Sequence, residues 1–466
     1  MRILLINPPA RVLASESIVV PPLGLAYLAS AAADAGHDVD LLDAFGLGLD
    51  WDGFEQRLAG SSYDLIGLTG MTPVIDTTIR AAGICRPHAR LLMLGGAHAT
   101  AMRTLVFEQM PELDMAIIGE GEETFVELLA ALDSGAAPQE VRGVLLKDGS
   151  FGGERPLIKD VNTIAFPARH MLPQDNYRYP LCDELPFTTI ISSRGCPFGC
   201  TFCDKSVFGT KWRARSADNV LAEIDKVVAE DGVRSIVFYD DLFTLDNDRL
   251  QRICHGLIDR DYGISWKAEG RVDIIDEESL RLMRKAGCDT IAYGVETANQ
   301  HGLDYLRKKT TPAMVRKAFA ATRRAGIRTM GYFILGIPVE TYDDALRTID
   351  FASEIKADYA QFSVLSPIRG TVIYDEALTK GWYKEIAAHN VCDKDMLRPA
   401  IISENWTEQQ LVDIVRIAHR RFYLRPGYIL KKALGIRSIS ELMRMISLGM
   451  GVALYSFGIG RQSNED

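Results

Sequence analysis

The sequence predicts an α/β protein with two sheet-forming regions and a helical end. Three observations predict this fold class. Over residues 1 to about 150, short apolar runs alternate with helical patterns, which is typical of buried parallel strands joined by helices. The same alternation returns from Phe187 and continues through six strand-and-helix pairs. Beyond about residue 390 the patterns are mainly helical.

The first region, residues 1–150, predicts a doubly wound, Rossmann-like parallel sheet. Its expected strands end in the segments NPP, GLTGMTP, GGAHAT and GEGEE. Ligands bind at such carboxyl ends in open α/β sheets. In chain order the expected elements are a strand at 2–7, a helix at 24–36, a strand at 38–44, a helix near Phe54, a strand at 64–70, a helix at 76–85, a strand at 90–96, a helix from Thr100, and a strand followed by a helix within 114–132.

Residues 151–185 predict a linker, because they carry several prolines and little periodicity. Residues 186–390 predict a partial (β/α)6 barrel of the TIM type, whose active residues belong at the carboxyl ends of the strands. Residues 391–466 predict a helical C-terminal region. The six barrel strands are expected at 188–193, 235–241, 265–271, 289–296, 328–336 and 359–366.

The composition argues against some classes of function and location. A formal net charge of −10 argues against nucleic-acid binding through phosphate neutralisation. The eight cysteines form no disulfide framework, which indicates a reducing compartment. Pro8 and Pro9 break the N-terminal apolar run too early for a signal peptide, and no apolar stretch reaches the roughly 18 residues of a membrane span. We therefore expect a cytoplasmic protein.

Three cysteines lie within eight residues directly after the first expected barrel strand. Cys196, Cys200 and Cys203 have CxxxCxxC spacing in a loop that also contains glycines. Thiolates at this spacing can hold one face of an iron–sulfur cubane, which leaves one iron open to a molecule that is not protein. The alternatives are a structural zinc site completed by Asp204 or His170, and a chance grouping of free thiols.

The loop resembles the cluster motif of the radical S-adenosylmethionine (radical SAM) enzymes, with Phe202 as the aromatic residue before the last cysteine. The resemblance implies that Cys196, Cys200 and Cys203 bind a [4Fe–4S] cluster and are the catalytic residues. It also implies that the open iron chelates S-adenosylmethionine, which one electron from the cluster cleaves to methionine and a 5′-deoxyadenosyl radical. Phe202 is then expected near the adenine, and an electron donor such as flavodoxin or ferredoxin is an expected partner.

Polar residues end several barrel strands, and the segments around them resemble successive segments of the same family. Asp240 and Asp241 are expected to receive the methionine ammonium group of S-adenosylmethionine. Glu269 and Arg271, at the end of the next strand, are expected to contact S-adenosylmethionine, and Arg271 could bind a carboxylate through two nitrogens. Glu296 is expected to accept the ribose hydroxyls. The alternative for each residue is a strand-end turn or a salt bridge.

The N-terminal region resembles the cobalamin-binding domain of one radical SAM subfamily, in the stretches NPP, PPLGLAYLA, GHDVDLLDA, GLTGMTPVIDTTI, GGAHAT and GEGEETF. The acids of GEGEE would repel a phosphate, but they suit a ligand rich in amide donors such as cobalamin. The alternative is a turn with acids at a helix N-terminus. The residues expected to contact cobalamin are Thr72, Pro73, Val74, Gly95, Gly96, His98, Glu120, Gly121 and Glu122.

No Asp-x-His-x-x-Gly motif occurs in the sequence, so no histidine is expected to ligate cobalt from below. His98 is instead expected to satisfy backbone groups of its loop, and His37 is expected at the surface. The lower face of a base-off cobalamin is expected near Thr72 to Ile75.

These resemblances imply a cobalamin-dependent radical SAM enzyme that modifies an unactivated carbon of a small biosynthetic intermediate, with C-methylation as the expected outcome. The first alternative is a radical reaction without methylation, such as a dehydration, deoxygenation, cyclisation or rearrangement. The second is a non-catalytic iron–sulfur or cobalamin sensor. Val339 and Arg369 depart from the common family pattern, which leaves the substrate class open.

The C-terminal tail from Arg416 to Arg461 combines basic and apolar residues. One interpretation is peripheral contact with an anionic membrane surface. The other, favoured by the glycines of the last part, is that the tail packs against the barrel and closes its open side. The apolar residues concerned are Leu442, Met445, Ile446, Met450, Val452, Leu454 and Phe457.

Overall fold

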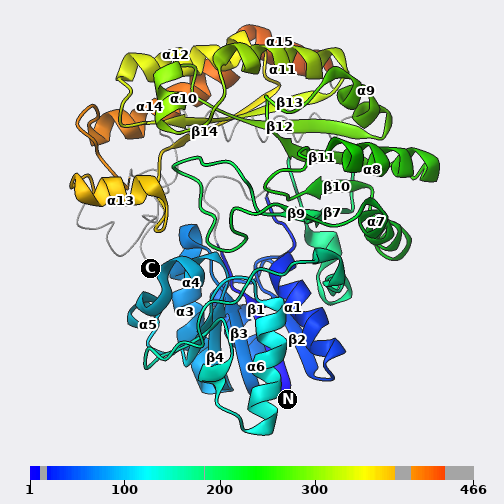
Figure 1. The fold of residues 1–466 in the computed structure, drawn as a ribbon, viewed down its shortest axis with the longest axis vertical. Coiled ribbons are helices and arrows are strands. Elements are labelled where there is room, and N and C mark those ends of the chain that lie inside the picture. The colour runs from blue at the N-terminus through cyan, green and yellow to red at the C-terminus, as the bar shows by residue number, and fades with distance from the viewer. Residues whose placement is uncertain (11–17, 183, 384–399, 436–466) are drawn as a thin grey trace. The chain divides into compact units, whose positions relative to one another are not determined.

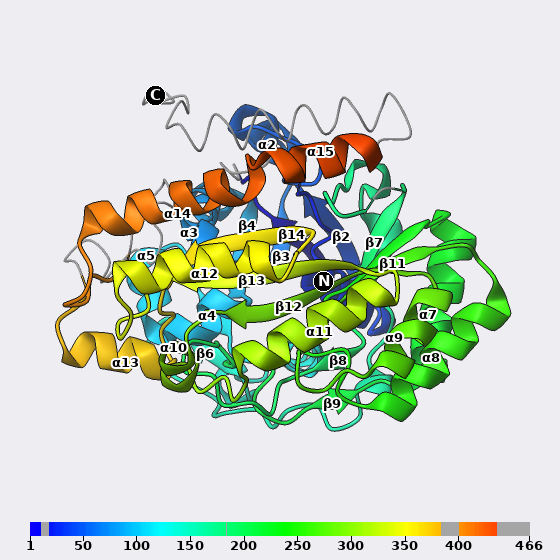
Figure 2. The same cartoon turned by 90° about the horizontal axis from the view of Figure 1, so that it is seen from above.

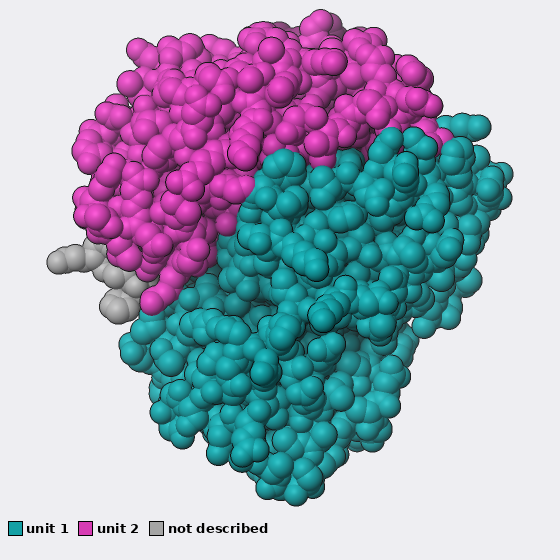
Figure 3. Space-filling model, in the orientation of Figure 1, with its two compact units in different colours: residues 1–198, 204–269, 285–289 teal, residues 199–203, 270–284, 290–466 magenta. Residues whose placement is uncertain are grey.

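The computed structural model describes residues 1–10, 18–182, 184–383 and 400–435. These residues form two compact units, which are coloured teal and magenta in Figure 3. Both units consist of strands alternating with helices, so the expected α/β class is confirmed. Unit 1 contains 1–198, 204–269 and 285–289, and unit 2 contains 199–203, 270–284 and the described part of 290–466.

The first sheet of unit 1 has six strands in the order β2-β1-β3-β4-β5-β6 (Figure 1). Strands β1 to β5 pair in parallel, which confirms the doubly wound arrangement. Alternate residues of β1 enter opposite cores, because successive side chains of a strand point to opposite faces: Leu4 and Ile6 enter one core, and Ile3 and Leu5 enter the other. The strands are β1 (Arg2–Asn7), β2 (Asp38–Asp43), β3 (Tyr63–Thr69), β4 (Ala89–Gly95), β5 (Met115–Ile117) and β6 (Val144–Leu146).

Helices cover both faces of this sheet (Figure 1). The core with Leu4 and Ile6 is closed by α2, α3, α4 and α5, and the core with Ile3 and Leu5 is closed by α1 and α6. Every helix expected from the sequence in this region is present. The helices are α1 (Leu23–Asp34), α2 (Trp51–Leu58), α3 (Ile75–Cys85), α4 (Ala97–Met102), α5 (Val106–Gln109) and α6 (Glu122–Ser134).

The edge strand β6 corrects the expectation of a wholly parallel sheet, because it pairs antiparallel with β5. The chain reverses at Gly143, where φ is 84° and an added Cβ would lie 2.7 Å from the Thr124 hydroxyl oxygen. A glycine is required there, since other residues rarely adopt this conformation. A strand of three residues shows no usable hydrophobic period, so the sequence pattern did not reveal it.

The second part of unit 1 contains three parallel strands in the order β11-β10-β7. All three were expected from the sequence. A short antiparallel ribbon of β8 and β9 follows β7. The elements are β7 (Phe187–Ile190), β8 (Ser193–Arg194), β9 (Arg213–Ala214), α7 (Ala217–Asp231), β10 (Ser235–Phe238), α8 (Asn247–Arg260) and β11 (Ser265–Gly270).

Unit 2 contains the other three expected strands, which pair in parallel in the order β14-β13-β12. Helices α11 and α12 pack against β13, and α14 packs against α12 and β14 (Figure 2). The strands are β12 (Cys288–Glu296), β13 (Arg328–Leu335) and β14 (Tyr359–Val364). The helices are α9 (Glu277–Lys285), α10 (Gln300–Tyr305), α11 (Pro312–Arg324), α12 (Tyr342–Glu354), α13 (Val372–Thr379), α14 (Glu408–Tyr423) and α15 (Pro426–Gly435).

Side-chain caps begin several helices directly after the strand-end loops. The Ser216 hydroxyl caps α7, and the Asp246 carboxylate caps α8. Thr341 and Asp344 form a reciprocal capping box at the start of α12. Each cap satisfies backbone NH groups that have no partner within the helix, and so marks where the helix begins.

Between β6 and β7 the described residues form only three short 3₁₀ turns, yet they are well packed. Tyr177 is fully buried and its hydroxyl donates to Asp43 at the end of β2, at 2.8 Å. Arg169 donates to the Thr189 carbonyl of β7 at 2.6 Å and pairs with the buried Glu223 at 2.7 Å. The linker is thus joined by hydrogen bonds to both sheets of unit 1.

The described part of the C-terminal region packs against unit 2. The Lys431 ammonium lies 2.8 Å from Asp358, and the Tyr428 hydroxyl donates to the Asp358 carbonyl at 2.9 Å. Lys432 lies over the ring of Tyr359. These contacts support the interpretation of the tail as a structural cap, whereas the seven apolar residues from Leu442 to Phe457 lie outside the described residues. None of the helices in the described ranges is long and apolar enough to cross a membrane.

Candidate active site

The three-cysteine loop is closed at its base by the β8–β9 ribbon. Arg194 of β8 faces Arg213 of β9, and residues 195–212 form the loop between them. Gly195 has a φ of 84°, and an added Cβ would lie 2.5 Å from the Lys211 carbonyl oxygen. The first residue of the loop must therefore be glycine, because the returning chain leaves no room for a side chain.

The loop cysteines differ from the other described cysteines in exposure. Cys196 and Cys200 are partly exposed and Cys203 is exposed. Burial raises the pKa of the Cys85 and Cys254 thiols to about 12, so these two thiols stay protonated and unreactive. Cys182 and Cys288 are also buried. Only the loop thiols are therefore placed to act as ligands within the described part of the chain.

The donor set of the loop fits a [4Fe–4S] cluster with one open iron. It offers three accessible sulfur atoms, which iron–sulfur clusters require. In the ranges that the structure describes, no three Cys, His, Asp or Glu side chains are gathered at metal-binding distance, the loop cysteines included, so the arrangement of the cluster ligands stays a prediction. Asp204, the first candidate fourth ligand of a zinc site, accepts hydrogen bonds from Ser206, and His170, the other candidate, is exposed.

Phe202 lies in an apolar cluster of unit 2 with Ile373 and Trp382. The Lys308 ammonium lies 6.0 Å from the centroid of the Phe202 ring. Lys308 is 8% exposed, and its Nζ is 2.6 Å from Oε1 of Glu296. Burial alone would lower the pKa of Lys308, but the carboxylate of Glu296 and the thiol of Cys200 raise it above its usual value. The ammonium is therefore held charged beside the cluster loop.

Sequence reasoning missed Lys308. Its neighbours Arg307 and Lys309 are exposed and have positive φ values, whereas Lys308 points inward. A run of three basic residues usually indicates a solvated surface, so the pattern carried no signal for a buried cation. The side chain of Lys308 points inward and those of Arg307 and Lys309 point outward because of the backbone conformation of this segment, which the sequence does not reveal.

Two of the residues expected to bind S-adenosylmethionine lie around Lys308 in unit 2. Glu296 has a φ of 66°, at the register shift between β12 and β13. A positive φ strains the backbone of a residue other than glycine, and such strain is frequent at functional sites. Arg271 binds Asp273 through two nitrogens, at 2.9 and 3.0 Å, and donates to the Lys308 carbonyl at 2.9 Å. Their contacts with S-adenosylmethionine stay predictions.

The other predicted contacts of S-adenosylmethionine lie in unit 1. Asp240 is buried and accepts three hydrogen bonds of 2.6 Å from Ser192 and Ser193, which ties the ends of β7 and β10 together. Asp241 is exposed and accepts from the Gly195 NH at 2.9 Å, so it is the more accessible carboxylate. Neither contact with the methionine ammonium group is tested by this geometry.

Glu269 belongs to a polar group on the inner side of β11. Its Oε1 is 2.6 Å from Nζ of Lys267, which is 2% exposed and lies over the Tyr179 ring. Tyr239, at the end of β10, is 41% exposed. The carboxylate of Glu269 is therefore engaged by a buried cation, which favours the salt-bridge alternative for this residue.

At the ends of β3 and β4, His98 is buried and bonded through both ring nitrogens. Nδ1 is 3.1 Å from the Thr72 hydroxyl, and Nε2 is 2.9 Å from Oε1 of Gln109. The expectation that His98 satisfies backbone groups is wrong, because both partners are side chains. The predicted contact of His98 with cobalamin, and its predicted lack of a bond to cobalt, stay predictions. Gly96, with a φ of 97°, lets the loop pass close to the Gly70 carbonyl.

The burial of His98 predicts a pH effect on stability. Burial lowers the pKa of His98 below its ordinary value of 6.5, so the unfolded chain binds the proton more tightly than the folded chain. The stability that depends on neutral His98 is present above pH 6.5 and is lost as the pH falls below that value. We expect the wild type to lose more free energy of unfolding than His98→Gln between pH 7 and about pH 5, as measured by urea denaturation.

An equal loss in both proteins would show that His98 does not titrate on unfolding. His419, whose pKa is also lowered by burial, is present in both proteins and cancels in the comparison.

The acids of GEGEE make ion pairs in unit 1. Glu120 is buried and contacts Arg194 at 2.9 Å and Arg213 at 2.8 Å. Glu122, at the start of α6, pairs with Arg194. These carboxylates are engaged by arginines, so their expected contact with cobalamin, and that of Gly121 between them, stay predictions.

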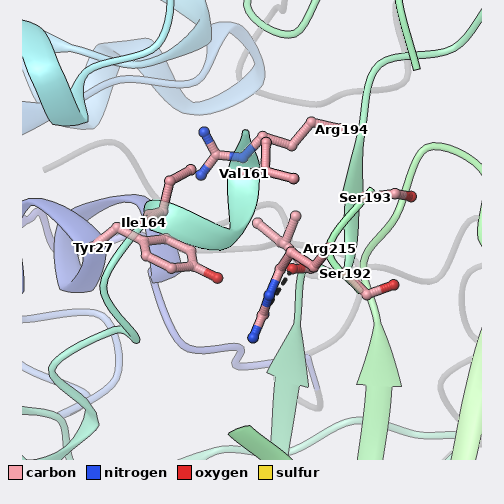
Figure 4. A pocket seen from close by; sticks show the side chains of 8 residues that line it. Tyr27, Val161, Ile164, Ser192, Ser193, Arg194 and Arg215 are labelled. Atoms are coloured by element: carbon pink, nitrogen blue, oxygen red, sulfur yellow. Dashed lines mark hydrogen bonds between the residues drawn. The ribbon is translucent and has the colours of Figure 1, made fainter. Parts of the chain in front are cut away.

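A small pocket, open to solvent, lies beside the ribbon in unit 1 (Figure 4). Tyr27, Arg194 and Arg215 point toward it, and Arg215 donates to the Ile191 carbonyl. None of the cysteines in the described ranges lines this pocket. Its walls are completed by Val161, Ile164, Ser192 and Ser193.

The loop with three accessible thiols indicates an iron–sulfur protein. The doubly wound domain that precedes it indicates a second domain that binds a ligand. Family models match both parts: the radical SAM superfamily at residues 190–352 and the B12 binding domain at residues 12–129. The chain belongs to the radical SAM enzymes that carry a B12-binding domain.

Relatives support this assignment. The chain is 33% identical to an uncharacterized methyltransferase, PH0819, of Pyrococcus horikoshii, over 92% of this chain and 94% of the relative. It is 30% identical to an anaerobic magnesium-protoporphyrin IX monomethyl ester cyclase of Cereibacter sphaeroides, over 94% of this chain and 73% of the relative. The fold is similar to the radical S-adenosylmethionine methyltransferase TsrM of Kitasatospora setae, with a TM-score of 0.68 and 19% identity over 81% of this chain and 75% of that chain.

The expected cofactors are thereby confirmed. They are a [4Fe–4S] cluster, S-adenosylmethionine and cobalamin. The chain is an enzyme, it acts on a small molecule, and it requires a reductant, as its radical SAM domain implies.

Proposed function

We propose that this enzyme transfers a methyl group to an unactivated carbon of a small biosynthetic intermediate. The observation that carries the proposal is the presence, in one chain, of a loop with three accessible thiols and a B12-binding domain. When bound, the cluster and S-adenosylmethionine supply a radical that removes a hydrogen atom from the substrate, and cobalamin supplies the methyl group.

The residues of the chain hold and orient these groups. Cys196, Cys200 and Cys203 would provide the sulfur ligands, and three thiolates leave one iron of the cluster to S-adenosylmethionine. Phe202 offers an aromatic face for the adenine, backed by the apolar cluster of unit 2. Asp241 remains accessible for the methionine ammonium group.

We place cobalamin at the carboxyl ends of β3 and β4. Pro73 is exposed and Met71 is 60% exposed there, which leaves an apolar surface open to a ligand. Nothing lies within 4 Å of where a Cβ of Gly95 would be, so the end of β4 leaves space for a large ring. His98 is engaged by Thr72 and Gln109, so it supports the loop without binding cobalt.

We expect the reductant to be a small electron carrier such as flavodoxin or ferredoxin, because the cluster needs one electron for each radical formed. The partly exposed position of the loop cysteines supports access by such a carrier.

A second candidate is a radical reaction without methyl transfer. It is favoured by the 30% identity to a cyclase over 94% of this chain. The two reactions share the cluster chemistry and differ only in whether methyl leaves the enzyme on the product.

The test is anaerobic turnover with S-adenosylmethionine that carries a trideuterated methyl group. We expect the product of the correct small-molecule substrate to gain one trideuteromethyl group by mass spectrometry, together with one 5′-deoxyadenosine per product. Product and 5′-deoxyadenosine without deuterium would favour the second candidate. Turnover by protein that contains no cobalamin would contradict the proposed methyl transfer.

A further inference from the structure

The GEGEE segment, expected to face a ligand, is instead bonded to the base of the cluster loop. Both oxygens of Glu120 are engaged: Oε1 by Arg194 at 2.9 Å and Oε2 by Arg213 at 2.8 Å. The Ile158 NH also donates to Oε2 at 2.9 Å. Glu120, Arg194 and Arg213 are 6%, 4% and 5% exposed. We call these three residues the Glu120 latch.

The latch lies where the cluster loop begins and ends. Arg194 and Arg213 are the facing residues of the β8–β9 ribbon, and residues 195–212 run between them. Arg213 also donates to the Phe208 carbonyl inside the loop at 3.0 Å, and Arg194 lies over the rings of Phe208 and Tyr27. The Cys196 NH is bonded to the Gly209 carbonyl. One carboxylate therefore holds both ends of the loop that carries the cluster ligands.

The β8–β9 ribbon by itself holds the two ends of the cysteine loop together only weakly. It has two residues on each side, and a pair of such short strands is not stable by itself in water. Facing arginines repel each other, so the ribbon needs a negative charge between them. Glu120 supplies it from the end of the first sheet, 74 residues before Arg194.

We propose that Glu120 is a positioning residue for the [4Fe–4S] cluster: it closes the cysteine loop from the B12-binding domain and so sets the arrangement of the ligands. The inference rests on the proposed use of this loop for the cluster, but not on methyl transfer. Glu122 also pairs with Arg194. It does not reach Arg213, so it contributes to holding only one end of the loop.

The test measures loop opening directly in the full chain before cluster reconstitution. Alkylation of each cysteine by iodoacetamide is followed by peptide mass spectrometry in the wild type and in Glu120→Gln. We expect the rate at Cys196 to rise by roughly tenfold or more, because Arg213 loses its carboxylate partner, Arg194 keeps only Glu122, and the ribbon opens locally. The rates at Cys85 and Cys254, buried in unit 1 away from the loop, should not change.

The matched control is Glu123→Gln, which makes the same charge change in the same segment. Glu123 is largely exposed and only approaches Arg155 at 3.5 Å, so the Cys196 rate should stay at the wild-type value. Arg213→Gln is the second variant, because it leaves Glu120 paired with Arg194 and is the milder lesion. It should raise the Cys196 rate by less than Glu120→Gln does.

After reconstitution, Glu120→Gln should release iron to a chelator faster than the wild type, and the reduced cluster should show a changed electron paramagnetic resonance signal. An unchanged Cys196 rate in Glu120→Gln overturns the proposal, as does a rise at Cys85 and Cys254 in step with Cys196. An enzyme that fails to methylate would leave these rates as expected, so a failure of the proposed function is distinguishable from a failure of the latch.

Discussion

Replacing any one of Cys196, Cys200 and Cys203 with alanine is expected to reduce 5′-deoxyadenosine formation to the background level. A [4Fe–4S] cluster with three protein ligands has no spare thiolate, so the loss of one ligand leaves two irons without protein sulfur. The cysteines are partly or fully exposed, so the free energy of unfolding should change by about 1 kcal/mol or less. The measurements are iron content, 5′-deoxyadenosine yield and urea denaturation of each variant.

Cys85→Ala is the matched control, since it removes a thiol that is fully buried in the first sheet of unit 1. It should keep the cluster and the cleavage activity and lose only about 1 kcal/mol of stability through the small cavity. Full iron content and full cleavage activity in a loop variant would refute the assignment of these thiols as cluster ligands.

The second large effect is expected at Lys308. Lys308→Met leaves Glu296, which is 5% exposed, without its cation at 2.6 Å. Removing one partner of a buried ion pair costs about 3–5 kcal/mol, because the remaining charge is stranded away from water. We expect a loss of this size in the free energy of unfolding, with a loss of 5′-deoxyadenosine formation, since the pair lies beside Phe202 and Cys200.

Two variants make this expectation specific. Lys309→Met removes the same charge from the adjacent, exposed position and should change stability little. The double variant Lys308→Met with Glu296→Gln removes both charges and should regain most of the lost stability, because no buried charge is left unpaired. A single and a double variant of equal stability would show that the Lys308–Glu296 pair is not coupled.

Much of the fold was predictable from the sequence, because its signal is local. Each of the six barrel strands is a short apolar run next to a helical pattern, and all six are present. In β1, the continuous run from Ile3 to Ile6 indicates a strand buried on both faces, and the structure places its residues in two different cores. β6 escaped prediction because three residues carry no period.

The candidate site was predictable only in part. Cys196, Cys200 and Cys203 lie close together in the chain, so their spacing alone was enough to predict them as cluster ligands. Strand-end acids such as Asp240 and Glu269 were predicted from their positions after apolar runs and from the family resemblance, but their hydrogen-bond partners were not. Asp240 is bonded by Ser192 and Ser193, and Glu269 by Lys267.

The sequence by itself determined the α/β class and the family and predicted the cysteine ligands, since each depends on residues close together in the chain or on motifs in order. The tertiary structure alone decided which charges meet. Glu120 binds Arg213, 93 residues away, and Lys308 turns inward between two exposed basic neighbours. The physical reason is that a buried charge must find an opposite charge in space, and neither composition nor spacing says which distant residue the fold will bring to it.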